Sequence, residues 1–130
     1  MKLSSRAIYG IRVCSLISTE ERTPVALSLI AEKSELSEKY LEQILGSLVK
    51  GGVLVSTRGV NGGYSLARNT SEISLLDILV AVDDVMEVGC GGKCDKICPD
   101  KATFVEIENK IHDIFKSSSL ESITLKREEQ

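Results

Sequence analysis

The stretch that decides the fold is SEKYLEQILGSLVKGGVLVSTRGVNGGY, residues 37–64. Ser37 is of a residue type that caps helix N-termini, and the double glycine at Gly51 and Gly52 is typical of a helix end. Between them the apolar residues recur at helical spacing on one stripe, namely Leu41, Ile44, Leu45, Leu48 and Val49. The pattern predicts a helix from Ser37 to about Lys50 that buries one face.

A β-hairpin is predicted directly after this helix. Residues 53–58 and 63–67 read as two strands, and Asn61-Gly62 between them is the dipeptide most suited to a type I′ turn. Two further helices are predicted earlier, over residues 4–18 and about 25–33, with Pro24 in a place that suits the first helical position. Two helices joined by a tight turn and followed by a hairpin predict a winged helix-turn-helix over residues 1–70.

Residues 71–130 are predicted to form a second part of the chain. A short helix is expected over 74–82, a loop over about 87–100, a long helix over 101–116, and a frayed tail over 126–130. Apolar residues of the long helix alternate at three and four residues, namely Phe104, Ile107, Ile111 and Ile114. A lone helix with such a seam needs a partner, so a homodimer is expected. The fold class is mainly α with a small β-wing.

Composition and charge narrow the function. The chain has 130 residues, no Trp and five Tyr and Phe in total, which disfavours a stacking platform for single-stranded nucleic acid and a large enzyme pocket. No run is long and apolar enough to span a membrane, and no signal peptide is visible, so a cytoplasmic protein without a membrane partner is expected. Residues 1–70 hold nine Lys and Arg against six Asp and Glu, whereas residues 71–130 hold seven against thirteen, so a polyanion would meet the first part.

The helix from Ser37 carries residues suited to reading DNA. In a helix-turn-helix its first turns face the major groove, where Gln43 can pair with adenine and Glu42 can accept from cytosine. Lys39 and Tyr40 can reach phosphate or base edges. Arg58 stands just before the Gly-rich tip of the predicted wing, where an arginine can enter a minor groove. The competing interpretations are a solvated helix face and an ordinary hairpin with a surface arginine.

Three of the four cysteines, Cys90, Cys94 and Cys98, lie within nine residues of the Gly-bearing loop. A flexible loop can bring such thiolates to one metal centre, either zinc or an iron–sulfur cluster, and both usually take four ligands. The fourth ligand has to come from elsewhere in the protein or be exogenous, and the protein candidates are Glu87, Asp95, Asp100, His112, Cys14 or a partner chain. Cys14 is expected to be a small buried hydrophobe, and His112 a surface or dimer-contact residue.

The chain resembles the IscR/NsrR-type winged-helix transcription regulators, which sense iron–sulfur clusters, redox state or nitric oxide. The matching stretches are Met1–Arg6 with Tyr9-Gly10, Ser37–Gln43, Arg58–Tyr64 and the three-cysteine loop, in the family's order and over nearly the whole chain. Two positions depart from the family. IscR-type members have a histidine three residues after the last cysteine, where this chain has Lys101. NsrR-type members take an acid from the partner's first helix, where this chain has Ile8.

The resemblance implies a homodimer crossed at the long helix and a palindromic double-stranded DNA operator. It implies DNA contacts from the reading helix and the wing, namely Ser37, Lys39, Tyr40, Glu42, Gln43, Arg58, Gly59 and Asn61. It also implies an iron–sulfur cluster on Cys90, Cys94 and Cys98, with [2Fe-2S] favoured over [4Fe-4S]. The alternatives are a cluster-free regulator that uses the cysteines as a thiol or zinc switch and, in a different class, a small electron-transfer protein, for which the cysteine spacing is wrong.

Overall fold

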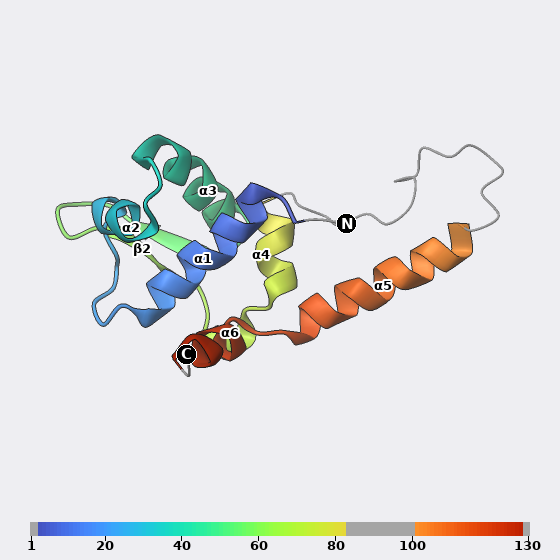
Figure 1. Cartoon of the computed structure of the whole chain (residues 1–130). Coiled ribbons are helices and arrows are strands. Elements are labelled where there is room, and N and C mark those ends of the chain that lie inside the picture. Colours follow the sequence, from blue (N-terminus) through green and yellow to red (C-terminus); the bar gives the residue numbers. More distant parts are fainter. Residues whose placement is uncertain (1–2, 83–100, 129–130) are drawn as a thin grey trace.

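The computed structural model describes residues 3–82 and 101–128, with the side chains of residues 3–82 and 102–124. Helices predominate, and Figure 1 shows α1, α3 and α4 grouped in one body from which α5 extends. In chain order the elements are α1 Ser5–Thr19, α2 Leu27–Ser34, α3 Glu38–Lys50, β1 Leu54–Thr57, β2 Gly63–Leu66, the 3-10 turn η1 Thr70–Glu72, α4 Leu75–Ala81, α5 Lys101–Ser117 and α6 Leu120–Glu128. The prediction of a mainly helical fold with a small β-wing is confirmed.

Serine side chains begin four of the described helices, with Ser119 at α6 accepting from the Ser122 N–H. The hydroxyl of Ser4 accepts from the Ala7 N–H at α1, and that of Ser37 accepts from the Tyr40 N–H at α3. At α4, Ser74 and Asp77 cap each other's backbone in a reciprocal pair. Such caps satisfy N–H groups that have no partner within the helix. The predicted N-cap at Ser37 is confirmed, and Gly51 ends the same helix as expected.

One apolar core holds these helices together. The side chains that α3 buries in it, Leu41, Ile44, Leu45 and Leu48, are all inaccessible to water. The same cluster takes residues of α1, of the segment that leads into α4, of α4 itself, and of α6, including Val13, Ile17, Ile73, Ile78, Leu79 and Leu120. The core contains residues from both sides of the predicted boundary between residues 1–70 and 71–130. The two parts therefore share one core, and their division stays a prediction about function.

The wing is a two-stranded antiparallel hairpin, but its turn differs from the prediction. Thr57 pairs with Gly63, so five residues separate the strands. The Gly62 N–H donates to the Gly59 carbonyl at 3.0 Å, and neither Asn61 nor Gly62 has the positive φ of a type I′ turn. The prediction of an Asn61-Gly62 type I′ turn is therefore wrong.

Backbone proximity explains the glycine at the start of β2. A Cβ built on Gly63, whose φ is +151°, would meet the Val25 carbonyl oxygen at 2.2 Å. Val25 and Tyr64 exchange two backbone hydrogen bonds of 2.8 and 2.9 Å directly beside it. This bridge joins the wing to the start of α2, so Gly63 allows two backbones to approach more closely than any side chain would permit.

Two ends of predicted elements differ from the structure. Pro24 stands before α2 rather than at its first position, and a cis peptide bond joins Thr23 to it. The predicted frayed tail from Lys126 is helical as far as Glu128, as part of α6. Figure 1 shows α6 under the body, near α1, whereas α5 extends away from the body. Backbone bonds join this region to α4, from the Leu75 N–H to Ser118 and from the Leu120 N–H to Ile73, each 2.8 Å long.

Candidate nucleic-acid interface

The outer face of α3 presents the predicted reading residues. Lys39, Glu42 and Gln43 are exposed, and they lie at positions i, i+3 and i+4 of the helix, so their side chains leave on one side. α2 lies before them in the helix-turn-helix, and Glu35 makes the turn with a left-handed φ of 60°. Ser37 is exposed too, but its hydroxyl already accepts from the Tyr40 N–H at 3.2 Å. The structure therefore brings three of the five predicted helix residues together on one free surface.

Tyr40 differs from its neighbours on α3 because it is half-buried and its ring packs against α1. The ring meets that of Tyr9 in α1 edge-to-face, with centroids 6.0 Å apart and planes at 89°. The Arg12 guanidinium carbon in turn lies 5.2 Å from the centroid of the Tyr9 ring. Such contacts stabilise a helix pair. The sequence did not predict the packing of Tyr9 and Arg12 beside Tyr40, although their i, i+3 spacing on α1 was visible.

The wing residues predicted to contact DNA are on its exposed tip. Arg58, Gly59 and Asn61 are all exposed, and Val60 between them makes no contact that shields it from water. A groove separates the wing from the start of α2 and α3, and its lining residues include Ser28, Glu38, Thr57, Arg58 and Tyr64. Arg58 supplies a cation to this groove and Glu38 an anion, so the groove itself has no strong preference of sign.

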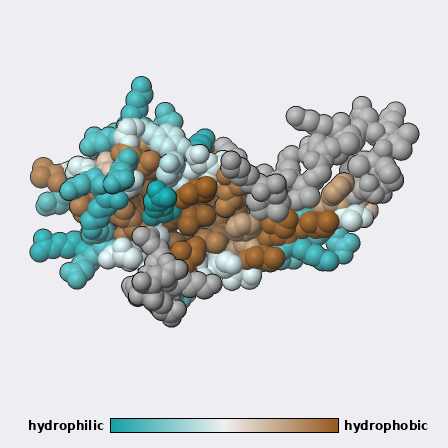
Figure 2. All heavy atoms as spheres, in the orientation of Figure 1, coloured by the Kyte–Doolittle hydropathy of each residue, from teal (hydrophilic) through white to brown (hydrophobic). Residues whose placement is uncertain are grey.

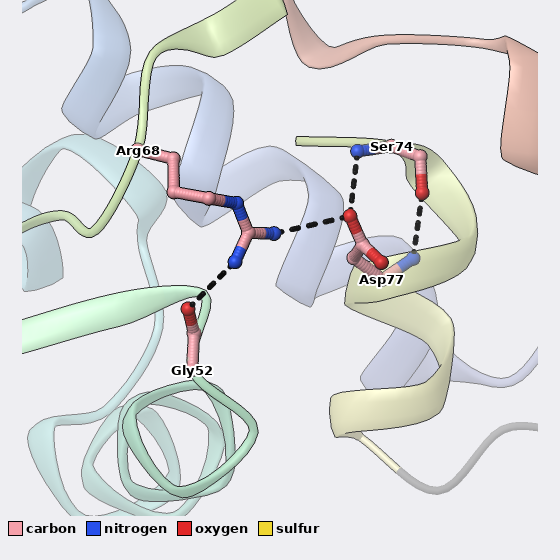
Figure 3. A network of polar contacts seen from close by, with 4 residues as sticks. All are labelled: Gly52, Arg68, Ser74 and Asp77. Atoms are coloured by element: carbon pink, nitrogen blue, oxygen red, sulfur yellow. Dashed lines mark hydrogen bonds and ion pairs between the residues drawn. The ribbon is translucent and has the colours of Figure 1, made fainter. Parts of the chain in front are cut away.

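A polar network fixes the base of the wing (Figure 3). The Arg68 guanidinium donates to the Gly52 carbonyl at 3.4 Å and to Oδ2 of Asp77 at 3.1 Å. The same Asp77 oxygen accepts from the Ser74 N–H at 3.0 Å, and the Ser74 hydroxyl accepts from the Asp77 N–H. The network links the loop after α3 to the N-terminus of α4. Both ionic side chains are about two-fifths exposed, so the ion pair is a weak contact.

The three loop cysteines, Cys90, Cys94 and Cys98, fall outside the described residues, as do Glu87, Asp95 and Asp100. Within residues 3–82 and 101–128, no group of three or more His, Cys, Asp or Glu side chains could hold a metal ion. Cys14 is completely buried in the core, and burial raises the pKa of its thiol from 9.0 to about 12. The expectation that Cys14 is a small buried residue of the core is confirmed. His112 on α5 is half-buried, and its buried Nε2 has no hydrogen-bond partner among the described residues.

The predicted seam of α5 is only partly covered within the chain. Phe104 and Ile111 are half-buried, whereas Ile107 and Ile114 are 39% and 64% exposed. Figure 2 shows apolar side chains continuing from the centre of the body along α5.

None of the described helices is long and apolar enough to span a bilayer.

The model of the Rrf2 family, described as iron-dependent transcriptional regulators, matches residues 3–126. The chain belongs to the Rrf2 family. It is similar to the HTH-type transcriptional regulator IscR of Photorhabdus laumondii, with 31% identity over 98% of this chain and 82% of that protein. Among solved structures, T. potens IscR has a TM-score of 0.80 and 30% identity, covering 99% of this chain and 90% of that one.

A second solved relative is CymR, the global cysteine regulator of B. subtilis. It has a TM-score of 0.77 and 26% identity, covering 95% of this chain and 96% of that one. These relatives are transcription regulators, so this Rrf2 protein is a DNA-binding transcription regulator and not an enzyme. The resemblance stated from the sequence is thereby confirmed.

Proposed function

We propose that this Rrf2 protein is a cytoplasmic, homodimeric regulator that binds a palindromic operator and changes its DNA affinity with the state of its three-cysteine loop. The exposed Lys39, Glu42 and Gln43 on a capped helix beside an arginine-tipped wing support sequence-specific binding. Gln43 and Glu42 would read base edges in the major groove, and Arg58 would enter the minor groove. Ser37, Tyr40, Gly59 and Asn61 complete the proposed contact surface.

The packing of Tyr40 gives it a positioning role within that surface. Its ring is fixed against Tyr9, so it sets how the first turn of α3 lies on α1. Its hydroxyl is then the group that would contact a phosphate. Tyr40→Phe should therefore keep most of the specificity, whereas Tyr40→Ala should lose it.

Dimerisation is supported by the open part of α5. Phe104, Ile107, Ile111 and Ile114 follow one side of the helix, and two of them remain exposed. A second copy of the same helix would cover them and would place two reading helices with two-fold symmetry. A palindromic operator has the same symmetry, which is why the two proposals belong together.

The proposed cofactor is an iron–sulfur cluster held by Cys90, Cys94 and Cys98, of the [2Fe-2S] type, with [4Fe-4S] as the alternative. When bound, such a cluster supplies chemistry that responds to oxidants, to nitric oxide and to iron supply. Three thiols fit most of a cluster's donor set, and the buried Cys14 does not complete it. The unpartnered Nε2 of His112 stays a candidate for the fourth ligand, beside Asp95, Asp100 and a group from the partner.

The DNA proposal is tested on an operator selected by the wild-type protein from random duplexes. Gln43→Ala should lower affinity for that operator by about 1–3 kcal/mol and leave random DNA unchanged, because base contacts specify. Arg58→Ala should also weaken operator binding by about 1–3 kcal/mol. Lys116→Ala, which removes an exposed cation on the side of α5 away from the apolar stripe, is the matched control. Equal losses by Gln43→Ala on both DNAs would reduce that residue to a positioning contact.

The cofactor proposal is tested by iron and sulfide analysis after anaerobic purification. Each of the variants Cys90→Ala, Cys94→Ala and Cys98→Ala should lose most of the iron and sulfide, and Cys14→Ala should keep both. A colourless wild-type protein that instead holds zinc, or whose DNA affinity follows thiol oxidation, would replace the cluster by a thiol or zinc switch.

A further inference from the structure

We propose that Gly46 and Arg6 form a phosphate contact at the far end of the reading face, which we call the Gly46 notch. The inference rests on the proposed DNA binding and extends it beyond the residues that read bases. A phosphodiester group of the operator backbone would lie over the bare backbone of α3 at Gly46 and accept from the Arg6 guanidinium.

Gly46 has no purpose that the fold itself explains. It lies in the middle of α3, seven residues after Lys39 and three after Gln43, so it shares their exposed face. Its φ is not positive, and a Cβ built on it would meet no atom of the described residues within 4 Å. Glycine inside a helix lowers helix stability relative to alanine. Since no described residue requires the missing side chain, the glycine points to a partner that approaches this backbone closely.

Arg6 supplies the cation beside this bare position. Its guanidinium donates to Oγ of Ser47 at 2.9 Å, and the Ser47 hydroxyl donates to the Gln43 carbonyl at 3.1 Å. These two bonds fix the guanidinium against the residue next to Gly46. The bond to Ser47 uses one of five N–H donors, and no carboxylate lies within 4.0 Å of Arg6 among the described residues.

The charges around the notch favour an anion. Lys50 lies one helical turn beyond Gly46, and Lys39 two turns before it, both exposed on the same face. Within the part of the chain that the structure describes, neither lysine has an ion-pair partner. Glu42 is the acid on this face, one turn before Gly46, and it is placed toward the end where base edges would be read. Around the notch two cations, Arg6 beside it and Lys50 one turn away, outnumber the one acid, Glu42, which also lies one turn away.

DNA backbone matches this surface better than a base edge does. A phosphate needs donors and a close approach rather than a long side chain that reaches into a groove. An arginine held by a neighbouring hydroxyl keeps its remaining N–H groups oriented, which reduces the entropy lost on binding. The notch would thus position the duplex against Gln43 and Glu42.

The first experiment is a size series at Gly46, measured on the selected operator. Gly46→Ala and Gly46→Gln should both raise the thermal midpoint, because alanine and glutamine are better helix formers than glycine. Operator affinity should fall more as the side chain becomes larger. The loss should reach about tenfold for Gly46→Gln, as expected when one charge-assisted hydrogen bond is displaced. A gain in stability with unchanged affinity for Gly46→Gln would overturn the proposal.

The second experiment measures the salt dependence of operator binding. Arg6→Met should reduce the slope of log affinity against log salt by about one, the contribution of one phosphate contact. Arg6→Lys should keep the slope, because it keeps the charge. Lys116→Met, which removes an exposed cation on the side of α5 away from the apolar stripe, is the matched control and should also keep it. An unchanged slope for Arg6→Met, with a folded protein by circular dichroism, would show that Arg6 only holds Ser47.

The two proposals fail in different ways. A wild-type protein that selects no duplex would contradict sequence-specific DNA binding itself. A wild-type protein that binds its operator, with Gln43→Ala impaired but both notch experiments negative, would keep the function and remove the notch.

Discussion

α3 and α5 carry the same kind of apolar stripe but bury it to different extents. In α3 the side chains of Leu41, Ile44, Leu45 and Leu48 have no exposed surface. In α5, whose stripe has similar spacing, Ile107 and Ile114 are 39% and 64% exposed. α3 packs on three described helices, α1, α2 and α4. Among the described helices, α5 makes extensive contact with α4 alone.

The difference separates two uses of one pattern. A stripe that is fully buried within the chain stabilises the fold, and its residues contribute at any protein concentration. A stripe left half-open contributes fully only when another surface covers it, so its contribution depends on concentration. The predictions below test whether α3 and α5 divide in this way.

The largest effect is expected at the exposed end of the α5 stripe. Ile114→Asp places a charge where the dimer would exclude water, and the two-fold symmetry introduces it twice. We expect dimerisation to weaken by about 4–7 kcal/mol, while the single chain keeps its helix content, since residue 114 is exposed there. Sedimentation equilibrium at micromolar concentration measures the loss.

Asn109→Asp is the matched control, because Asn109 is an exposed residue on another side of α5. It should leave the dimer intact. If Ile114→Asp also stays dimeric, the open stripe of α5 is not the interface between copies, and the comparison with α3 loses its explanation.

The next effect belongs to the closed stripe of α3. Leu45→Ala leaves a cavity in a fully buried site and should lower the free energy of unfolding by about 2–5 kcal/mol. Urea titrations at two protein concentrations distinguish this from an interface effect. The loss in the free energy of unfolding should be the same at both concentrations. A loss confined to the dilute sample would instead place Leu45 at the interface.

Local signals made much of the fold predictable. Ser37, the stripe from Leu41 and the double glycine define α3 without help from tertiary structure, because caps and periodicity act within a few residues. The wing was predicted for a partly wrong reason. Asn61-Gly62 suggested a type I′ turn, which the structure does not have, and Gly63 is required by the approach of Val25, a contact that no local pattern reveals.

In the candidate site, too, local sequence patterns predicted the exposed residues but not the contacts between helices. Exposure of Lys39, Glu42 and Gln43 followed from the helix period, whereas the packing of Tyr40 on Tyr9 depends on how α1 and α3 cross. α6 was missed because its nine residues carry little amphipathic pattern, and it is fixed instead by the burial of Leu120 and its backbone bond to Ile73. Tertiary contacts, which local patterns do not encode, decided these cases.

Cys14 on α1 should have a smaller effect, on the pH dependence of folding stability. This effect tests whether water reaches the α1 side of the core. Its thiol has a pKa of about 12 in the folded protein and 9.0 as the ordinary value, so between these values only the unfolded chain loses the proton. Stability from this group is complete below pH 9 and is lost as the pH rises toward 12, at up to about 1.4 kcal/mol per pH unit. Denaturant unfolding of the wild type and of Cys14→Ala from pH 8 to 11 isolates this slope. Parallel curves would mean that water reaches the thiol.

The smallest effect is expected where the two regions are linked, at Arg68. Its guanidinium joins Gly52, after α3, to Asp77 of α4, the helix on which α5 packs. Because both charges are about two-fifths exposed, Arg68→Met should cost less than about 1 kcal/mol of folding stability, and high salt should remove the difference from wild type. Lys110→Met, which breaks the exposed pair with Glu106, is the control for a pair without such a link. If Arg68→Met also weakened the dimer while Lys110→Met did not, α3 and α5 would be coupled through α4, and the division between a closed and an open stripe would be incomplete.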